Sequence, residues 1–518
     1  MKRTGRLKEA VQLVMRAGYQ LDEEAFEFLG LLSTSEDPCG LVERALQSID
    51  LLEEKPFFIN RKILEGQVKL AEENDTLSIK SSHHEYENSE RAQLKESKRT
   101  FCSLAKEVEP EVSIIEDPSR KLCSNGEIED YLGYFQDRFR RTEKLLRQRI
   151  DARSATSVMD AFKAPANTKL KIIGMITSKR EANRKIFLSV EDLDASVTVL
   201  VPENCSQSLM NKANHILLDQ VVCLSVVKTR SNLLIVEDII LPEVAKKKQT
   251  RSAIPINAVL TSDMHVGSTR FQKKAFSRFI LWLNGKVGDS NLREAASRVK
   301  YVLIAGDIVD GVGIYPNQIK ELAIEDVHDQ YRLAANFIEQ IPDYIEVVII
   351  PGNHDATRKA LPQPAIPDEF MESLRDTRDV YSLGNPCYLR IHGVEVLLHH
   401  GRSLDDIIST VPGMSHHSPE RAMTLLLQSR HLAPMYGGKT PISAEKRDFL
   451  VIDHVPDVYH SGHIHRIGLS NYRGIVVVNS GCWQEQTDYM NSHGVVPTPG
   501  HVPVLDLHTL DVSSISFN

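Results

Sequence analysis

The segment Pro351-Gly352-Asn353-His354-Asp355 (PGNHD) decides how the C-terminal half of this chain folds, because it directly follows the apolar run IEVVII at 345–350. A short apolar run bounded by Pro and Gly predicts a buried β-strand. An amide, an imidazole and a carboxylate at the end of a buried strand are costly unless each finds a partner. The other apolar runs of this half end in the same way.

Four further runs after residue 254 end in side chains that bind metals or protons. They are followed by Asp263-Met264-His265, Asp307-Ile308-Val309-Asp310, His399-His400-Gly401 and His463-Ile464-His465. Apolar strands alternating with helical patterns predict an α/β domain over 254–518, and such sheets build their sites at the carboxyl ends of the strands. Each motif is weak by itself, but five strands that all end this way predict one shared site.

The donor types at these strand ends favour a pair of divalent cations. Mixed His, Asp and Asn ligands suit Mn, Fe, Ni or Zn better than Ca or an all-oxygen Mg site. Two ions about 3.5–4 Å apart clamp a phosphate and acidify a water, and they need a bridging carboxylate, for which Asp307 is the candidate. We expect His354 to protonate a leaving oxygen and Asp310 to orient its ring. Asp355 is predicted to cap a following helix.

The first half of the chain divides into four segments by its patterning. Residues 1–75 have helical periodicity and predict a small helical domain, and the polar, aperiodic segment 76–124 predicts a flexible linker. Residues 125–160 predict a helical connector with an arginine cluster; a solvated face with pairs such as Glu143 with Arg147 is preferred over nucleic-acid contact. Five short strands over 165–245, with a helix between the third and fourth, predict an OB-type barrel.

Composition sets broad limits on function. The chain has 518 residues, of which 42% are hydrophobic and 25% charged, as in a folded multidomain protein. A net charge of −8 gives no global sign of nucleic-acid binding. Seven cysteines without a C-x-x-C pair predict reduced thiols and a cytoplasmic location. No apolar run reaches 18 residues, so no membrane span is expected.

The motifs SDMHVGS (262–268), GDIVDG (306–311), GNHD (352–355), HHG (399–401) and GHIH (462–465) resemble those of the calcineurin-like metallophosphoesterase superfamily. The resemblance implies a β-sandwich flanked by helices. It implies one metal ion on Asp263, His265, Asp307 and His465, a second on Asp307, Asn353, His400 and His463, and His354 as general acid. Mn²⁺ is the first expectation, with Mg²⁺, Ni²⁺, Fe²⁺ or Zn²⁺ as alternatives. His399 would then face the opposite side of its strand from His400.

The order of domains, with the segments HHGRSLDDII (399–408) and RHLAPMYGGKTPISAEKRDFLVIDHVPDVYHSGHIH (430–465), resembles the small subunits of archaeal family D replicative DNA polymerases. This resemblance implies a proofreading 3′–5′ exonuclease that acts on single-stranded or frayed 3′ ends. It also implies a heterodimer with a large catalytic subunit, and contact with the sliding clamp at most through that partner. Eukaryotic relatives that lost the ligands act as scaffolds. The filled ligand positions favour an active nuclease here, and a scaffold that binds the large subunit remains the alternative.

A stand-alone hydrolase of small phosphodiesters is the third reading, and the additional domains disfavour it. Arg358 and Arg402 lie next to expected ligands and are candidates either for phosphate contact or for ion pairs. Tyr315, Tyr436 and Trp483 are candidates either for stacking on a terminal base or for packing in the core.

Overall fold

The structure is a computed structural model that describes residues 101–492 and 494–518, together with 10–15, 17, 19–21, 25–26, 28–29, 38–50, 58–59, 61 and 63–64. The chain forms two compact units: residues 1–103 with 277–297, and residues 104–276 with 298–518. In the first unit, α3 (Pro38–Asp50) and the parallel pair β1 (Gln20–Leu21) and β2 (Phe58–Ile59) contribute to a small apolar core. Helix α9 (Ser290–Ser297) belongs to this unit, and α8 (Lys273–Leu283) runs across the boundary.

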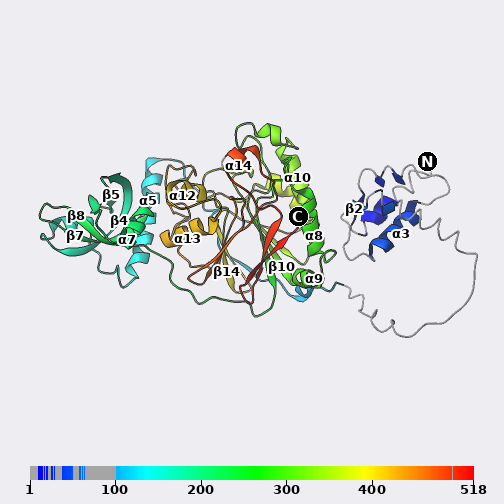
Figure 1. Cartoon of the computed structure of the whole chain (residues 1–518), viewed down its shortest axis with the longest axis horizontal. Helices are drawn as coiled ribbons and strands as arrows, with labels where there is room; N and C mark the ends of the chain where they lie inside the picture. Colours follow the sequence, from blue (N-terminus) through cyan, green and yellow to red (C-terminus); the bar gives the residue numbers. More distant parts are fainter. Residues whose placement is uncertain are drawn as a thin grey trace, which may run out of the picture. The chain divides into compact units, whose positions relative to one another are not determined.

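Residues 169–240 of the second unit form a closed five-stranded barrel in the order β4-β5-β6-β8-β7 (Figure 1). Its elements are β4 (Lys169–Ala182), β5 (Lys185–Glu191), β6 (Ser196–Val201), α7 (Gln207–Asn214), β7 (Val221–Lys228) and β8 (Leu234–Ile240). The expected five strands and the helix between the third and fourth are confirmed. Alternate residues of β5 point into the barrel core, which is the period of a strand with one buried face.

Two six-stranded sheets form the α/β part of the second unit. The first has the order β12-β11-β10-β9-β18-β19, and the second β16-β17-β15-β14-β13-β3. The first contains β12 (Tyr381–Ser382), β11 (Glu346–Ile350), β10 (Val299–Ala305), β9 (Asn257–Thr261), β18 (His501–Asp506) and β19 (Val512–Ser516). The second contains β16 (Gly468–Tyr472), β17 (Ile475–Asn479), β15 (Val458–Ser461), β14 (Val394–His399), β13 (Cys387–Ile391) and β3 (Val112–Glu116).

The two sheets pack face to face around one apolar core. Leu303 and Val348 of the first sheet lie in the same buried cluster as Val396 and Val478 of the second. The opposite face of the second sheet packs against α12 (Leu404–Thr410) and α13 (Pro419–Ser429) (Figure 1). Truncating one such core side chain to Ala costs roughly 2–5 kcal/mol, so this core holds the strand ends in place.

The remaining helices of this unit are short, except α5, which has 20 residues. They are η1 (Leu104–Glu107), α5 (Ile128–Arg147), α6 (Val158–Lys163), η2 (Gln318–Glu321), α10 (Val327–Ile338), α11 (Asp368–Arg375) and α14 (Asp488–Ser492). No helix in the described part of the chain is long and apolar enough to cross a membrane.

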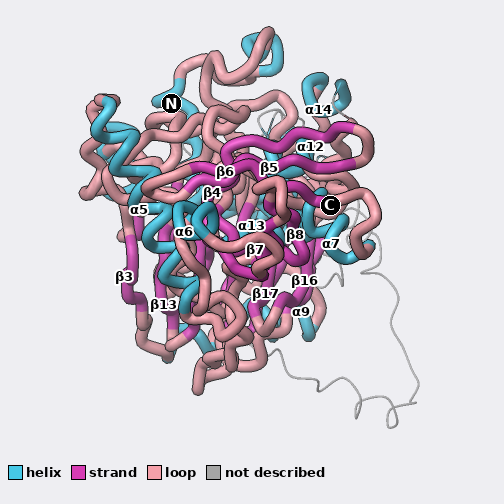
Figure 2. Tube along the Cα trace, turned by 90° about the vertical axis from the view of Figure 1, so that its left-hand side faces the viewer, coloured by secondary structure: helices cyan, strands magenta, loops and turns pink. Residues whose placement is uncertain are grey.

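The predicted linker contains a strand. Residues 76–100 lie outside the described residues, but Val112–Glu116 form β3, which pairs antiparallel with β13 at the edge of the second sheet (Figure 2). The linker prediction is therefore wrong for these residues. An edge strand is specified largely by the free N–H and C=O groups of its neighbour, which the polar local composition does not reveal.

The arginine cluster of α5 is only partly solvated. Glu143 and Arg147 form the expected i,i+4 pair, with nitrogen and oxygen 2.8 Å apart. Arg138, in contrast, is almost fully buried and forms a 2.8 Å ion pair with Asp448, so the prediction of a solvated face is wrong there. A buried guanidinium needs such a partner, and this pair ties α5 to the α/β part of the unit.

Candidate metal centre

All seven predicted ligand positions lie together at one edge of the sandwich. Asp263 and His265 follow β9, Asp307 follows β10, Asn353 follows β11, His400 follows β14, and His463 and His465 follow β15. Five of the seven have left-handed backbone, with φ between 50° and 70°. Such backbone is rare for residues with a side chain and persists only where the surroundings enforce it, and such residues cluster at functional sites.

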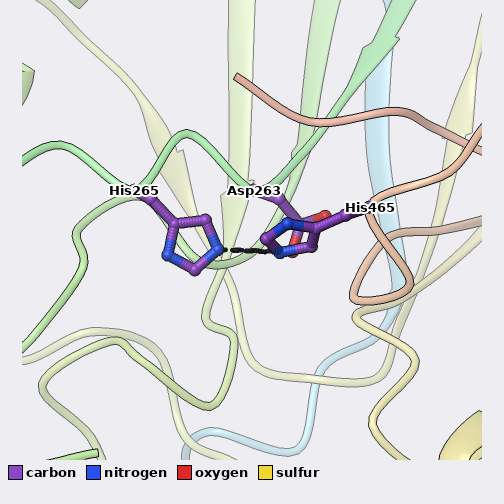
Figure 3. A group of neighbouring side chains, drawn as sticks. All are labelled: Asp263, His265 and His465. Carbon is purple, nitrogen blue, oxygen red and sulfur yellow. Dashed lines mark hydrogen bonds and ion pairs between the residues drawn. The ribbon is translucent and has the colours of Figure 1, made fainter. Parts of the chain in front are cut away.

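The inner group consists of Asp263, His265 and His465, which point toward one another (Figure 3). The Nε2 atoms of the two imidazoles are 2.9 Å apart, and Asp263 Oδ1 is 3.3 Å from His465 Nε2. The other ring nitrogen of His265, Nδ1, donates to the Asp310 carboxylate at 3.0 Å. That carboxylate also accepts from Gln318 and from Gln484.

Asp310 contacts the His354 ring, as predicted, but the expected His–Asp dyad through its carboxylate is wrong. His354 Nδ1 lies 2.7 Å from the backbone carbonyl oxygen of Asp310, and the carboxylate faces His265 instead. The reason is that the glutamine donors hold the buried carboxylate on the side of the inner group. The contact leaves His354 Nε2 free to face the adjoining cavity, 4.0 Å from Asp307 Oδ2.

The outer group consists of Asp307, His400 and His463, with Asn353 beside them. His400 Nε2 lies 3.0 Å from Asn353 Oδ1 and 3.3 Å from Asp307 Oδ2, while its Nδ1 donates to the carbonyl of Ala305 at 2.8 Å. The neighbouring His399 is buried on the opposite side, 3.1 Å from the Tyr459 hydroxyl, as predicted.

Sequence reasoning missed one carboxylate of the outer group. Asp405, on α12, lies 2.9 Å from His463 Nε2 and 3.4 Å from His416 Nε2. It stands five residues after His400 in the segment HHGRSLDDII, and this proximity was its only local signal. His265 and His463 therefore each have one ring nitrogen on a carboxylate, which fixes the tautomer and leaves the other nitrogen for a ligand, as in most metal-bound histidines.

Asp355 supports the site and does not cap a helix. It accepts hydrogen bonds from the Gly352 amide at 2.8 Å, the Ile308 amide at 3.2 Å and the Tyr331 hydroxyl at 3.0 Å. No helix begins directly after it, so the cap prediction is wrong. Asp355 ties the loops after β10 and β11 together. A Cβ at Gly352 would collide with the Asp307 carboxylate, which explains the glycine there.

Electrostatics favour anionic carboxylates in this pocket despite burial. Burial opposes ionisation of Asp263, but His465 holds the pKa of that carboxyl at about 2. Burial likewise opposes ionisation of Asp307, yet His400 and His354 keep its pKa well below the ordinary value. The charge of Asp307 in turn overcomes burial and raises the pKa of His400 to about 9. Burial lowers the pKa of His354 to about 4.

The donor set fits divalent cations. Asp263 Oδ1 is buried and accepts no hydrogen bond of good geometry from the described residues. Two imidazole nitrogens face it within 3.9 Å. An anionic oxygen and two nitrogen lone pairs that converge on one point are the arrangement a borderline metal ion satisfies.

A cavity of about 370 Å³ opens onto both groups: His265 and His465 line it from the inner group, and Asp307 and His463 from the outer. Its other lining residues include His354, Asp405, Arg402, Lys439, Tyr315 and Tyr489. Of the sequence candidates, Arg402 and Tyr315 line it. Arg358 instead pairs with Glu445 at 2.8 Å. Trp483 is buried and donates to Thr261. Tyr436 packs against aromatic rings of α5.

Comparison with known proteins identifies the family of the chain. The family of DNA polymerase alpha/epsilon B subunits matches residues 258–466, which contain all seven positions. The DNA polymerase II small subunit of Pyrococcus furiosus is 38% identical over 390 residues, 75% of this chain and 63% of the relative, so the match spans less than two thirds of that protein.

Two further small subunits are matched over more of their length. The DNA polymerase II small subunit of Archaeoglobus fulgidus is 38% identical over 76% of this chain and 78% of the relative. The DNA polymerase II small subunit of Methanothermobacter thermautotrophicus is 39% identical over 76% of this chain and 80% of the relative. Among solved structures, an archaeal phosphodiesterase is 14% identical and matches 50% of this chain and 99% of the phosphodiesterase chain. The TM-score of 0.25 is too low to support a statement about function. On the matches to the small subunits, this chain belongs to the family of DNA polymerase II small subunits.

Proposed function

We propose that this chain is the 3′–5′ exonuclease subunit of an archaeal replicative DNA polymerase and hydrolyses phosphodiester bonds at the 3′ ends of DNA. One observation carries the proposal: seven ligand-type side chains from five strand ends converge beside a cavity that His354 lines. The proposal includes a calcineurin-like phosphoesterase domain over 254–518 and an OB-type barrel over 165–245, after a helical connector over 125–160.

Two ions would share Asp307. One would be held by Asp263, His265, Asp307 and His465, and the other by Asp307, Asn353, His400 and His463. The position of Asp307 supports this, because its Oδ2 atom is 3.8 Å from His265 Nε2 and 3.3 Å from His400 Nε2. Mn²⁺ is the first candidate for this donor set. When bound, the ions would supply positive charge that stabilises the phosphodiester in the transition state and acidifies the attacking water.

His354 would act as the general acid. In its neutral form, Nδ1–H donates to the carbonyl of Asp310, which leaves Nε2 facing the cavity. Because burial lowers its pKa to about 4, the ring is neutral before substrate arrives. A bound phosphodiester adds negative charge nearby, which favours the protonated imidazole. His354 can then give this proton to the leaving 3′ oxygen, a step worth about 10²–10⁴-fold in rate.

A separate large catalytic subunit is the proposed partner, as the name of the family implies. The alternative function is a scaffold that binds and stabilises this partner with weak catalysis of its own. Both functions require assembly, and only the first requires His354.

The test is cleavage of a 5′-labelled single-stranded oligonucleotide with Mn²⁺, by the chain alone and by its complex with the large subunit. We expect a ladder that shortens from the 3′ end, absent in a His354→Ala variant that still binds the large subunit. His215→Ala, a histidine substitution in the barrel, serves as the matched control and should retain activity. Wild-type complex that leaves 3′ ends intact would favour the scaffold.

A further inference from the structure

A pair of tyrosines lies at the cavity and has no role in the metal groups. The rings of Tyr315 and Tyr489 are 5.4 Å apart and inclined by 32°, and both residues line the cavity. Tyr315 is also 6.3 Å from the His354 ring. The three rings thus form a row that begins at the proposed general acid and ends at Tyr489, which is 50% exposed.

One carboxylate holds the two tyrosines together. The Tyr315 hydroxyl donates to Glu321 Oε2 at 2.8 Å, and the backbone amide of Asp488 donates to Glu321 Oε1 at 3.1 Å. Asp488 is the first residue of α14, the helix that carries Tyr489. Glu321 therefore links the segment after β10 to the segment after β17, and the ring pair is built from two parts of the chain that are far apart in sequence.

Exposed, ordered aromatic rings beside a phosphoesterase site are suited to nucleobases. Stacking of a base on an aromatic side chain tolerates any sequence, because every base has a π-face, and contributes about 5- to 150-fold in affinity per base. The Tyr315 and Tyr489 rings lie too close together to admit a base between them. A base would therefore stack against the pair from the cavity. Arg402 and Lys439, which line the same cavity, supply positive charge for the phosphates.

We propose that Tyr315 and Tyr489 form a stacking platform for the base of the 3′-terminal nucleotide after it has left the duplex. This inference rests on the proposed exonuclease function and names the feature of the substrate that the site recognises. A base that is still paired has both faces covered by its neighbours in the helix and cannot reach the platform. The platform thereby favours single-stranded, frayed or mispaired ends over matched ones.

The test compares two oligonucleotides that differ only in whether the 3′-terminal residue carries a base or is abasic. With the wild-type complex, we expect cleavage of the normal end to exceed that of the abasic end by about 10-fold to 100-fold in kcat/KM. Tyr489→Ala should remove this difference by slowing the normal end alone. Tyr489→Phe should preserve it, because stacking needs the ring and not the hydroxyl. Tyr131→Ala, which changes an exposed tyrosine on α5, is the matched control.

A binding measurement separates this inference from the proposed function. We expect the fluorescence of 2-aminopurine at the 3′ end to be quenched by the His354→Ala complex and not by the double variant with Tyr489→Ala. Suppose that the wild-type complex cleaves DNA, that Tyr489→Ala leaves the preference for the normal end over the abasic end unchanged, and that the double variant quenches 2-aminopurine as strongly as His354→Ala. That result would overturn the platform and leave the exonuclease standing. Quenching that needs Tyr489 in a protein that cleaves no DNA would overturn the exonuclease and leave base binding standing.

Discussion

The inner and outer groups of the candidate metal centre share one plan and differ in the exposure of the carboxylates that support them. In each group, one histidine has a ring nitrogen on a supporting carboxylate: His265 on Asp310 in the inner group, and His463 on Asp405 in the outer. The Asp310 side chain is 0% exposed, whereas those of His463 and Asp405 are 14% and 34% exposed. Both groups reach the cavity, which His265 and His465 line from the inner group and Asp307 and His463 from the outer, but the carboxylate that supports the outer group is the more exposed. Since charges interact more strongly away from water, we expect the inner ion to bind more tightly than the outer one.

The largest expected effect comes from the residue that both groups share. Asp307→Asn should lower exonuclease activity about 10³-fold, because one substitution removes a negative charge from both ion positions. The bound Mn²⁺ should fall from two ions to one or none, measured by elemental analysis of the purified protein. Retention of two ions with full activity would contradict a shared carboxylate.

Substituting the carboxylates that contact His265 and His463 should affect the two ion sites separately. Asp310→Asn and Asp405→Asn should each weaken binding of one Mn²⁺ by about 10- to 100-fold, because each replaces the charged acceptor that orients a ligand with a weaker, neutral amide. Calorimetric titration should show the tighter site affected by Asp310→Asn and the weaker site by Asp405→Asn. If both substitutions weaken the same site, the division into inner and outer groups is wrong.

Substituting a charged residue that lines the cavity should have a smaller effect. Arg402→Ala should raise KM for an oligonucleotide about tenfold with little change in kcat, because it removes a charge that contacts substrate and leaves both ion sites unchanged. The difference from wild type should shrink as salt is added. A fall in the number of bound ions would instead assign Arg402 to the metal centre.

The metal-free protein should show a pH dependence that originates in the outer group. The folded pKa of His400 is raised to about 9 by Asp307, above the ordinary 6.5. Its contribution to stability is therefore complete below pH 6.5 and is lost as pH rises to about 9. The free energy involved is about 3 kcal/mol, so the midpoint of thermal unfolding in EDTA should fall by a few degrees across this window.

A His400→Ala variant should show a smaller decline, because burial opposes protonation of His465 but Cys482 and Asp263 hold its pKa well above the ordinary value, and His215→Ala should keep all of it. With Mn²⁺ present the trend should reverse, because ions and protons compete for the same imidazole nitrogen. A wild-type midpoint that is flat between pH 6.5 and 9 in EDTA would show that Asp307 and His400 are not paired in solution.

Much of the site could be predicted from local sequence. Strand patterning and ligand type, which are local properties, marked the strand ends. The resemblance to calcineurin-like phosphoesterases then selected the seven positions Asp263, His265, Asp307, Asn353, His400, His463 and His465. The same resemblance selected His400, and strand alternation then assigned His399 to the opposite side. The failures share one cause. The Asp310 carboxylate, Asp355 and β3 each have a partner at least 45 residues away in sequence: His265 for Asp310, Ile308 for Asp355, and Leu389 for Ile114 of β3.

By itself, the sequence determined that strands end in side chains of the types that bind metals, that a five-stranded barrel precedes them, and which polymerase subunits the chain resembles. Periodicity, turn residues and motif order carry this information, and each is readable within a few residues. The tertiary structure assigned each second partner: Asp405 to His463, the Asp310 carbonyl to His354, Asp448 to Arg138, and Glu321 to both tyrosine segments. Burial is the physical reason, because a buried polar group must pair with whatever the packing of distant segments brings within reach.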